Sequence, residues 1–246
     1  ITAQNYALKS TGEGQLIAEN STFNSIQDGL LVRETNSNFI GQISINTFGQ
    51  ESIGLDVLSG VHQWQEVTIS KNYDPQEIRF DNPENIAVLN LNCGNVIIKL
   101  NPDISPKSVE RFRMLINSGK YNNIAFHRVV KNVIVQAGDL EFGKKDNLNY
   151  LYIGTGKSGF GTIKSELNDE IEFKAGTVGM ARTNKLNTED SQFFILLEDA
   201  PLFKGEYTPI GQVVYGLEVL DTIADDYKRE YVLRPDFINS FKLLID

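Results

Sequence analysis

The residue types that most often carry chemistry are scarce in this chain. Cys93 is the single cysteine, and His62 and His127 are the two histidines. One cysteine excludes an internal disulfide framework and a multi-cysteine metal site, and so few ligands argue against a transition-metal site. Arg128, directly after a Phe–His pair, is a polar group of interest because a guanidinium stays charged and presents several N–H donors in a fixed fork. Taken alone, such an arginine is more often a surface or ion-paired residue.

A second candidate is the sequence Gly-Thr-Gly-Lys-Ser at residues 154–158, which ends like a phosphate-binding P-loop. That motif needs a glycine five positions before the final glycine and a helix directly after it, so that backbone N–H groups surround the phosphate. Leu151 occupies the position of the first glycine, and Gly159–Thr162 is a poor start for a helix. We therefore expect no nucleotide site here.

The elements that position these residues are mostly strands after Ile86. Ile86–Leu91 and Asn95–Leu100, joined through a turn that contains Gly94, predict a β-hairpin. Ser105 as N-cap and Pro106 in the first turn predict a helix near Pro106–Ser118, and a second short helix carries Leu217, Leu220 and Ile223. Further strands are predicted at Ile124–Val129, Val133–Ala137, Gly176–Ala181, Gln192–Leu197, Thr208–Val214 and Phe241–Ile245. Many strands with two helices favour a barrel with helical caps over an alternating α/β sheet.

Five motifs in this part occur in the order and spacing of one family. They are Phe126–Arg128, Val135–Asp139, Gly154–Gly156, Gly179–Arg182, and Asn187 followed by Ser191–Ile195. From about Ile86 to its end the chain therefore resembles the bacterial-type cyclophilins, which are peptidyl-prolyl cis-trans isomerases. The resemblance implies a mainly β fold, a closed antiparallel β-barrel capped by two helices, and catalysis without a cofactor.

The resemblance also implies roles for individual residues. Arg128 would donate to the prolyl nitrogen, Gln136 would orient Arg128 and contact the substrate carbonyl, and Phe194 would form the floor of the proline pocket. The substrate-binding residues implied by the same motifs are Val133, Ile134, Ala181, Arg182, Gln192, Leu202, Phe203 and Tyr207. Side chains alternate along a strand, so Phe193 should face the core where Phe194 faces the groove. His127 is expected to be structural, since the reaction transfers no proton.

Some pocket positions depart from the family pattern. Val133 and Ile134 replace a phenylalanine and a methionine, Leu202–Phe203 replaces a Trp–Leu pair, and Tyr207 replaces a histidine. The pocket stays apolar, but Val133 removes aromatic area that contributes about 1–2 kcal/mol of contact. The alternative to an active isomerase is therefore a degenerate cyclophilin that binds proline-containing segments with little turnover.

The first 80 residues contain short β-type segments separated by Gly, Asn and Ser, at Gln15–Ala18, Leu30–Arg33, Phe39–Ile45 and Val67–Ser70. We expect a small β-rich module over residues 1–80, a linker near residues 71–85, and the isomerase domain over residues 86–246. No family is recognised in the module, whose polar composition favours a periplasmic or secreted location over a cytoplasmic one. A third hypothesis makes this module the functional part, for adhesion or docking.

Composition and charge limit the partners. An apolar content of 41% with 22% charged residues is typical of a folded globular protein, and no apolar run reaches the roughly 20 residues of a membrane span. The net charge is −9, and residues 1–85 hold four basic and 11 acidic side chains. This balance argues against nucleic acid as a partner. The acidic surface of the module fits a solubilising role, which we favour, or a basic or polypeptide partner. Proline-containing polypeptides are the expected partners of the remainder.

Overall fold

The computed structural model divides the chain into two compact units, one built mainly from residues 1–74 and the other mainly from residues 75–246. It describes residues 78–92, 94–220, 223, 230–233 and 235–245, together with eight short strands within residues 1–57. Each unit is described by itself below.

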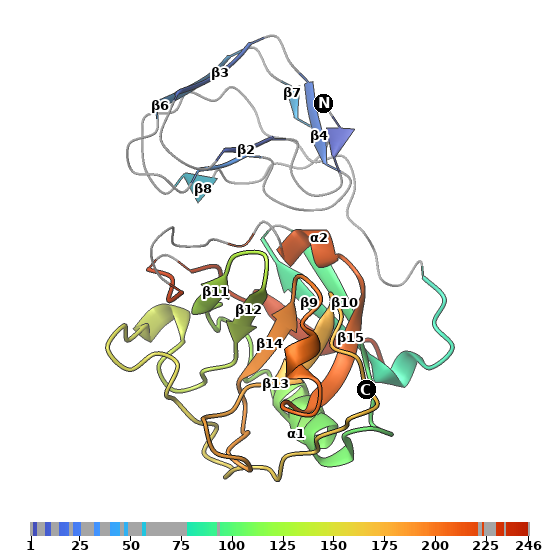
Figure 1. Ribbon diagram of the computed structural model, residues 1–246. Coiled ribbons are helices and arrows are strands. Elements are labelled where there is room, and N and C mark those ends of the chain that lie inside the picture. Colours follow the sequence, from blue (N-terminus) through green and yellow to red (C-terminus); the bar gives the residue numbers. More distant parts are fainter. Residues whose placement is uncertain are drawn as a thin grey trace. The chain divides into compact units, whose positions relative to one another are not determined.

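In the first unit, each described strand pairs in parallel with a strand that comes later or earlier in the chain. They are β1 (Thr2–Ala3), β2 (Leu8–Ser10), β3 (Gln15–Glu19), β4 (Thr22–Ser25), β5 (Val32–Glu34), β6 (Ile40–Ser44), β7 (Thr47–Phe48) and β8 (Asp56–Val57). They form three sheets in the orders β1-β4-β7, β2-β5-β8 and β3-β6. The arrows of these three sheets are drawn in blue in Figure 1.

The register repeats at nearly constant spacing. Thr2 pairs with Asn24, Gln15 with Ile40, and Thr22 with Thr47. Partners are thus 22 to 25 residues apart, a spacing within the range of the periods seen in repeat architectures. Strands β3, β5 and β6 fall on three of the predicted segments, whereas the predicted strand at Val67–Ser70 lies outside the described residues.

Eight described strands of the second unit form one antiparallel sheet in the order β11-β12-β14-β13-β15-β10-β9-β16 (Figure 1). Their bounds are β9 (Ile86–Leu91), β10 (Gly94–Leu100), β11 (Arg128–Val130), β12 (Ile134–Ala137), β13 (Thr177–Met180), β14 (Phe193–Leu196), β15 (Pro209–Tyr215) and β16 (Ser240–Leu243). Each overlaps a predicted strand, so the mainly β, barrel-like fold is confirmed.

The sheet curls, and the C-terminal segment connects its two edge strands. This segment makes isolated bridges with the chain around β11, between Arg128 and Tyr231 and between Ala125 and Phe237. It then continues into β16, which pairs with β9 from Ser240 opposite Asn90 to Leu243 opposite Ala87. The backbone groups at the outer edge of β11 are therefore paired with the chain itself, which protects that edge from pairing with other molecules.

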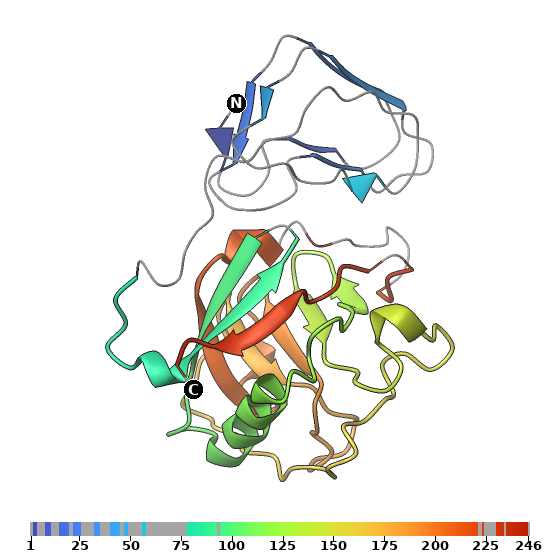
Figure 2. The ribbon, with the colours of Figure 1, turned by 180° about the vertical axis from the view of Figure 1, so that it is seen from behind.

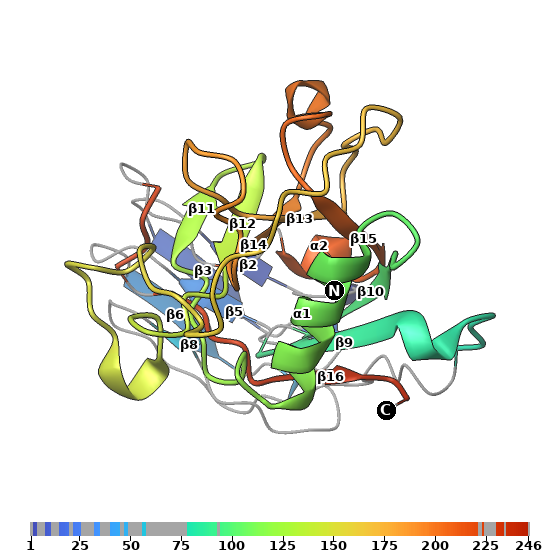
Figure 3. The same ribbon diagram turned by 90° about the horizontal axis from the view of Figure 1, so that it is seen from below.

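Helix α1 (Pro106–Asn117) matches the predicted helix and lies against the sheet beside β16, as Figures 2 and 3 show from behind and below. Its Phe112 ring contacts those of Tyr121, Phe193 and Phe241 at centroid distances of 5.1–5.5 Å. Close-packed aromatic rings of this kind contribute both buried area and edge-to-face contacts, so they fix the helix on the sheet.

The cap of α1 differs from the prediction. Ser105 occupies the N-cap position, but its hydroxyl donates to Pro209 O at 2.6 Å and makes no cap bond. Glu166 caps the helix instead, accepting from the N–H groups of Lys107 and Ser108 at 3.1 and 2.9 Å. A carboxylate at this end also complements the helix dipole.

The remaining helical segments are short: η2 (Pro83–Asn85), η3 (Lys145–Asn147), η4 (Pro201–Phe203) and α2 (Leu217–Leu220). Helix α2 contains two of the three apolar residues of the second predicted helix, and Ile223 lies beyond its end. Within the described part of the chain, no helix has the length and apolarity to cross a membrane.

Candidate active site

The register of the sheet places three predicted site residues in one row. Arg128 in β11 lies opposite Gln136 in β12, and Gln136 lies opposite Phe194 in β14. Directly opposed residues of antiparallel strands project from the same face. The row continues to Gly179 in β13 and, on the other side, to Tyr231.

Hydrogen bonds connect the polar members of this row to a neighbouring loop. Arg128 Nη1 donates to Gln136 Oε1 at 3.2 Å, and Gln136 Nε2 donates to Gln192 Oε1 at 3.0 Å. Gln192 Nε2 in turn donates to the carbonyl oxygens of Gly154 and Gly156 at 3.0 and 3.1 Å. Because Gln136 uses its oxygen towards Arg128 and its nitrogen towards Gln192, its amide orientation is determined by both neighbours.

An apolar cluster lies beside Gln136, whose strand partner Phe194 belongs to it. Buried Ile134, Phe173, Phe194 and Leu196 form its base, with Val130, Ala181, Ala200, Phe203 and Tyr207 partly buried against them. The Phe194 ring contacts Phe203 and Tyr207 nearly edge-on, at centroid distances of 5.6 and 5.2 Å. Phe193, the preceding residue, packs instead against Phe112 of α1, as the strand alternation predicts. Aromatic side chains of this apolar cluster thus lie beside the polar row.

The loop at residues 154–158 is held by two carboxylates. Buried Asp139 accepts from the N–H groups of Gly154 and Gly156 through Oδ2, at 2.7 and 3.0 Å, and from those of Glu141 and Phe142 through Oδ1. Asp190 accepts from the Ser158 N–H at 2.7 Å. The N–H groups of Gly154, Gly156 and Ser158 thus donate to carboxylates of the chain itself.

The edge of the apolar cluster carries Ala181 and, over its Tyr207, Arg182. The Ala181 N–H donates to Gln192 O at 2.8 Å, so a peptide that pairs here must use other backbone groups. The Arg182 guanidinium lies over the Tyr207 ring at 4.9 Å and donates to Glu206 O at 3.0 Å. Arg182 thereby supports the pocket wall from outside.

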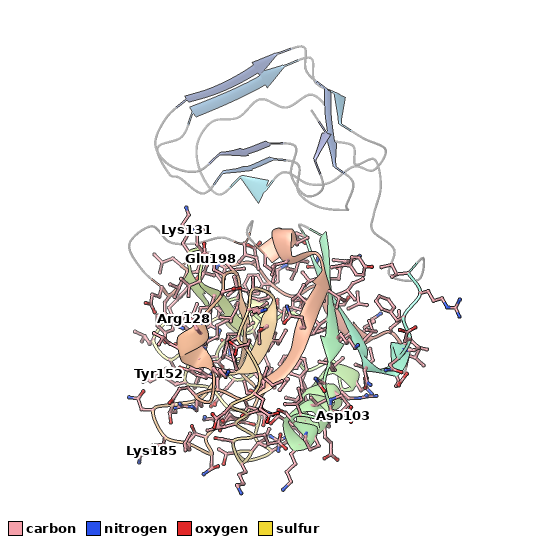
Figure 4. All side chains as sticks on the ribbon, turned by 45° about the vertical axis from the view of Figure 1, so that its right-hand side comes forward. Asp103, Arg128, Lys131, Tyr152, Lys185 and Glu198 are labelled. Carbon is pink, nitrogen blue, oxygen red and sulfur yellow. The ribbon has the colours of Figure 1, made fainter. Side chains whose placement is uncertain are left out.

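Figure 4 shows Arg128 on the same side of this unit as Tyr152, with Asp103 on the opposite side. A family model for cyclophilin type peptidyl-prolyl cis-trans isomerases matches residues 86–242. This match covers more than half of the chain and includes the row and the pocket. The chain belongs to the cyclophilin-type peptidyl-prolyl cis-trans isomerase family.

Relatives and solved structures agree with this assignment. A probable peptidyl-prolyl cis-trans isomerase of Brucella suis is 40% identical over 159 residues, which are 63% of this chain and 81% of the relative. An isomerase of Arabidopsis thaliana is 36% identical over 140 residues, covering 55% of this chain and 79% of the relative. A Cryptosporidium parvum cyclophilin, crystallised in the presence of the dipeptide Ala-Pro, has a TM-score of 0.56 and 27% identity over 64% of this chain and 98% of its own. AquaCyp293 of Hirschia baltica, at 21% identity and a TM-score of 0.56 over 70% of this chain and 81% of its own, supports the fold alone. The family and activity predicted from the motifs are thus confirmed: residues 86–242 form a cyclophilin-type isomerase.

Two of the predicted substrate-binding residues are exposed: Val133 at 38% and Leu202 at 87%. Phe203 and Tyr207, which follow Leu202 in the chain, pack partly buried against the apolar cluster. Phe173 and Leu196 also belong to the base and were not among the predicted site residues. Nothing in their local sequence distinguishes them from ordinary core residues.

His127 of the cyclophilin's Phe–His–Arg motif is completely buried. Burial lowers its pKa from 6.5 to about 4, against the opposing effect of the Asp139 carboxylate. The imidazole is therefore neutral at pH 7, which suits the structural role predicted for it.

Proposed function

We propose that the groove around Arg128 isomerises X–Pro bonds in unfolded or flexible polypeptides and so assists their folding. The observation that supports this most directly is the single row of Arg128, Gln136 and Phe194, which sets a charged donor beside an aromatic pocket. The dipeptide Ala-Pro was present with the Cryptosporidium relative, so a proline-containing peptide is the substrate class to expect for this groove.

The reaction needs a donor and a pocket but no nucleophile. Amide resonance creates a rotational barrier of about 18–20 kcal/mol. Twisting the bond removes that resonance and leaves a lone pair on the prolyl nitrogen, which then accepts a hydrogen bond. An N–H of Arg128 would donate to this nitrogen in the transition state only, and a group that binds the transition state selectively lowers the barrier.

The remaining residues would hold the peptide around the twisted bond. Phe194, Phe203, Tyr207 and Ile134 would surround the proline ring, with Val133 and Leu202 contacting the flanking residues from the rim. Gln136 would orient Arg128 and contact the substrate carbonyl, while Gln192, Ala181 and Arg182 would border the path of the extended peptide. The pocket keeps its aromatic walls, which favours turnover over the degenerate alternative.

The test is an isomerisation assay on short X–Pro peptides, followed by NMR exchange between the cis and trans signals. Arg128→Ala should lower kcat by about 10²-fold, the usual cost of removing a transition-state donor. Arg113→Ala is the matched control: Arg113 is a half-buried arginine of α1 that donates to Asn85 Oδ1 at 3.0 Å, and its variant should keep the kcat of the parent. Saturable binding by the parent without faster exchange would instead establish the binding-only alternative.

We also propose that residues 1–80 form a separate module. The division of the chain into two compact units and the independent parallel strand pairing of residues 2–57 support this proposal. Limited proteolysis that releases an intact, active fragment beginning near residue 80 would test it, and a fragment that cannot fold would contradict it.

A further inference from the structure

A short segment near the C-terminus, residues 230–233, lies along the outer edge of β11. The Val129 N–H donates to Glu230 O at 2.7 Å, and the Val232 N–H donates to His127 O at 3.0 Å. This pattern makes Arg128 and Tyr231 a directly opposed pair of the non-hydrogen-bonded kind, in which side chains come closest. Two backbone hydrogen bonds therefore fix Glu230 beside Arg128.

The Glu230 carboxylate contacts the guanidinium on the side away from Gln136. Its Oε2 accepts from Arg128 Nε at 2.9 Å and lies 2.7 Å from Nη2. Gln136 accepts from Nη1 at 3.2 Å. All three guanidinium nitrogens thus have a partner, and the only hydrogens left for a substrate are the second ones on Nη1 and Nη2.

The Glu230 carboxylate restricts the conformation of the Arg128 side chain. The Arg128 side chain is 27% exposed, so packing alone does not determine its conformation. A long flexible arginine held only by the neutral bond to Gln136 would sample several rotamers. A carboxylate that binds two nitrogens at once fixes the plane of the guanidinium as well as its position.

We propose that Glu230 is a positioning residue, which holds the guanidinium of Arg128 in the orientation required for donation to the prolyl nitrogen. This inference rests on the isomerase mechanism proposed above. Glu230 itself is 56% exposed, and exposed ion pairs contribute little to global stability. Its removal should therefore change turnover and leave folding almost unaffected.

The experiment compares Glu230→Ala, Glu230→Gln and the parent in the NMR exchange assay, with Glu172→Gln as the control. Glu172 is a similarly exposed carboxylate that pairs with Lys204 instead of Arg128. Misplacing a catalytic group costs up to about 10²-fold, and we expect Glu230→Ala to lower kcat by about 10-fold with KM within about twofold of the parent. Glu230→Gln, which keeps a neutral acceptor, should recover part of the loss, and Glu172→Gln should match the parent.

A second measurement isolates the positioning role. The Nε–H of Arg128 should exchange with water faster in Glu230→Ala than in the parent, since its acceptor is gone. Equal exchange in the two proteins, or an unchanged kcat in Glu230→Ala, would show that the inference is wrong. A parent protein without activity would instead count against the isomerase mechanism, so the two failures are distinguishable.

Discussion

At the scale of single residues, the position of the Phe194 ring depends on a glycine. Phe194 lies opposite Gly179 in the sheet, and its ring covers the glycine backbone. A Cβ built on Gly179 would be only 2.4 Å from Phe194 Cζ. The absence of a side chain at position 179 therefore allows the Phe194 ring to lie where it does, on the proposed floor of the proline pocket.

Gly179→Ala should displace the Phe194 ring into the pocket. Overpacking of this kind typically costs 1–3 kcal/mol, so we expect the free energy of unfolding to fall by about 2 kcal/mol. The displaced ring would occupy space needed by proline, and kcat/KM should fall by about 10-fold or more, since one such factor corresponds to about 1.4 kcal/mol of lost contact. Denaturant unfolding and the exchange assay measure the two effects.

A double substitution provides the control for this prediction. In a Phe194→Leu background the smaller side chain leaves room for the new methyl group, so adding Gly179→Ala should cost much less stability than it does in the parent. Contacting residues show such non-additive effects, whereas independent sites do not. Equal costs in both backgrounds would contradict the contact proposed between residues 179 and 194.

The residues of the site differ in how far the sequence could predict them. Arg128, Gln136 and Phe194 lie in short motifs that resemble those of the family, so the resemblance could propose them. Glu230 contacts Arg128 from 102 positions away. Glu230 lies outside the five motifs, and exposed glutamates are common. Only the folded structure therefore reveals its contact with Arg128.

At the scale of elements, the loop at residues 139–158 depends on a buried carboxylate, that of Asp139, which binds backbone groups from both of its ends. Asp139 receives four backbone N–H groups, two for each oxygen. Gly156 fits against it because a Cβ there would lie 1.9 Å from Asp139 Oδ1. Since Gln192 binds the carbonyl groups of the same loop, its order supports the row that contains Arg128.

Asp139→Asn should loosen this loop. An amide offers one oxygen where the carboxylate offers two, and its NH₂ group would face two N–H donors. Each buried donor left without a partner costs about 1–3 kcal/mol, so we expect a loss of about 2–4 kcal/mol in the free energy of unfolding. Urea unfolding checks the loss, and amide hydrogen exchange should accelerate at Gly154 and Gly156.

The matched control is Asp146→Asn, a change at an exposed position of the same loop. It removes the same charge without removing a buried acceptor, and it should leave both measurements unchanged. If Asp146→Asn and Asp139→Asn gave equal effects, net charge rather than the hydrogen bonds would be the cause, and the assigned role of Asp139 would fail.

At the scale of the whole molecule, the two units differ in how much their sequences reveal. The strands of residues 86–246 could be placed to within a few residues because their apolar patterns and turns are local. In residues 1–57 the strands β3, β5 and β6 could also be placed, but their parallel pairing could not. Parallel partners lie more than 20 residues apart, so local patterns do not reveal them. One sequence signal of the pairing is the Thr–Phe pair at residues 22–23, which recurs at residues 47–48 and pairs with it in register.

The stability of the whole protein should depend on pH through His127. Its pKa is about 4 in the folded state, because burial disfavours the charged form, and 6.5 in a model unfolded chain. Between these values the unfolded state binds a proton that the folded state does not. Stability is therefore fully present above pH 6.5 and is lost as the pH falls towards 4.

The size of this effect follows from the same two values. Each unit of difference between the two pKa values corresponds to about 1.4 kcal/mol, so the free energy of unfolding should fall by roughly 3 kcal/mol between pH 7 and pH 4. Carboxylates also titrate in this range, so the parent must be compared with His127→Gln, which has no such proton to bind. Denaturant unfolding at pH 7 and pH 4 should show the parent losing roughly 3 kcal/mol more than the variant. Equal losses would mean that His127 accepts its proton in the folded state, which would require the imidazole to be reached by water or paired with Asp139 as an ion.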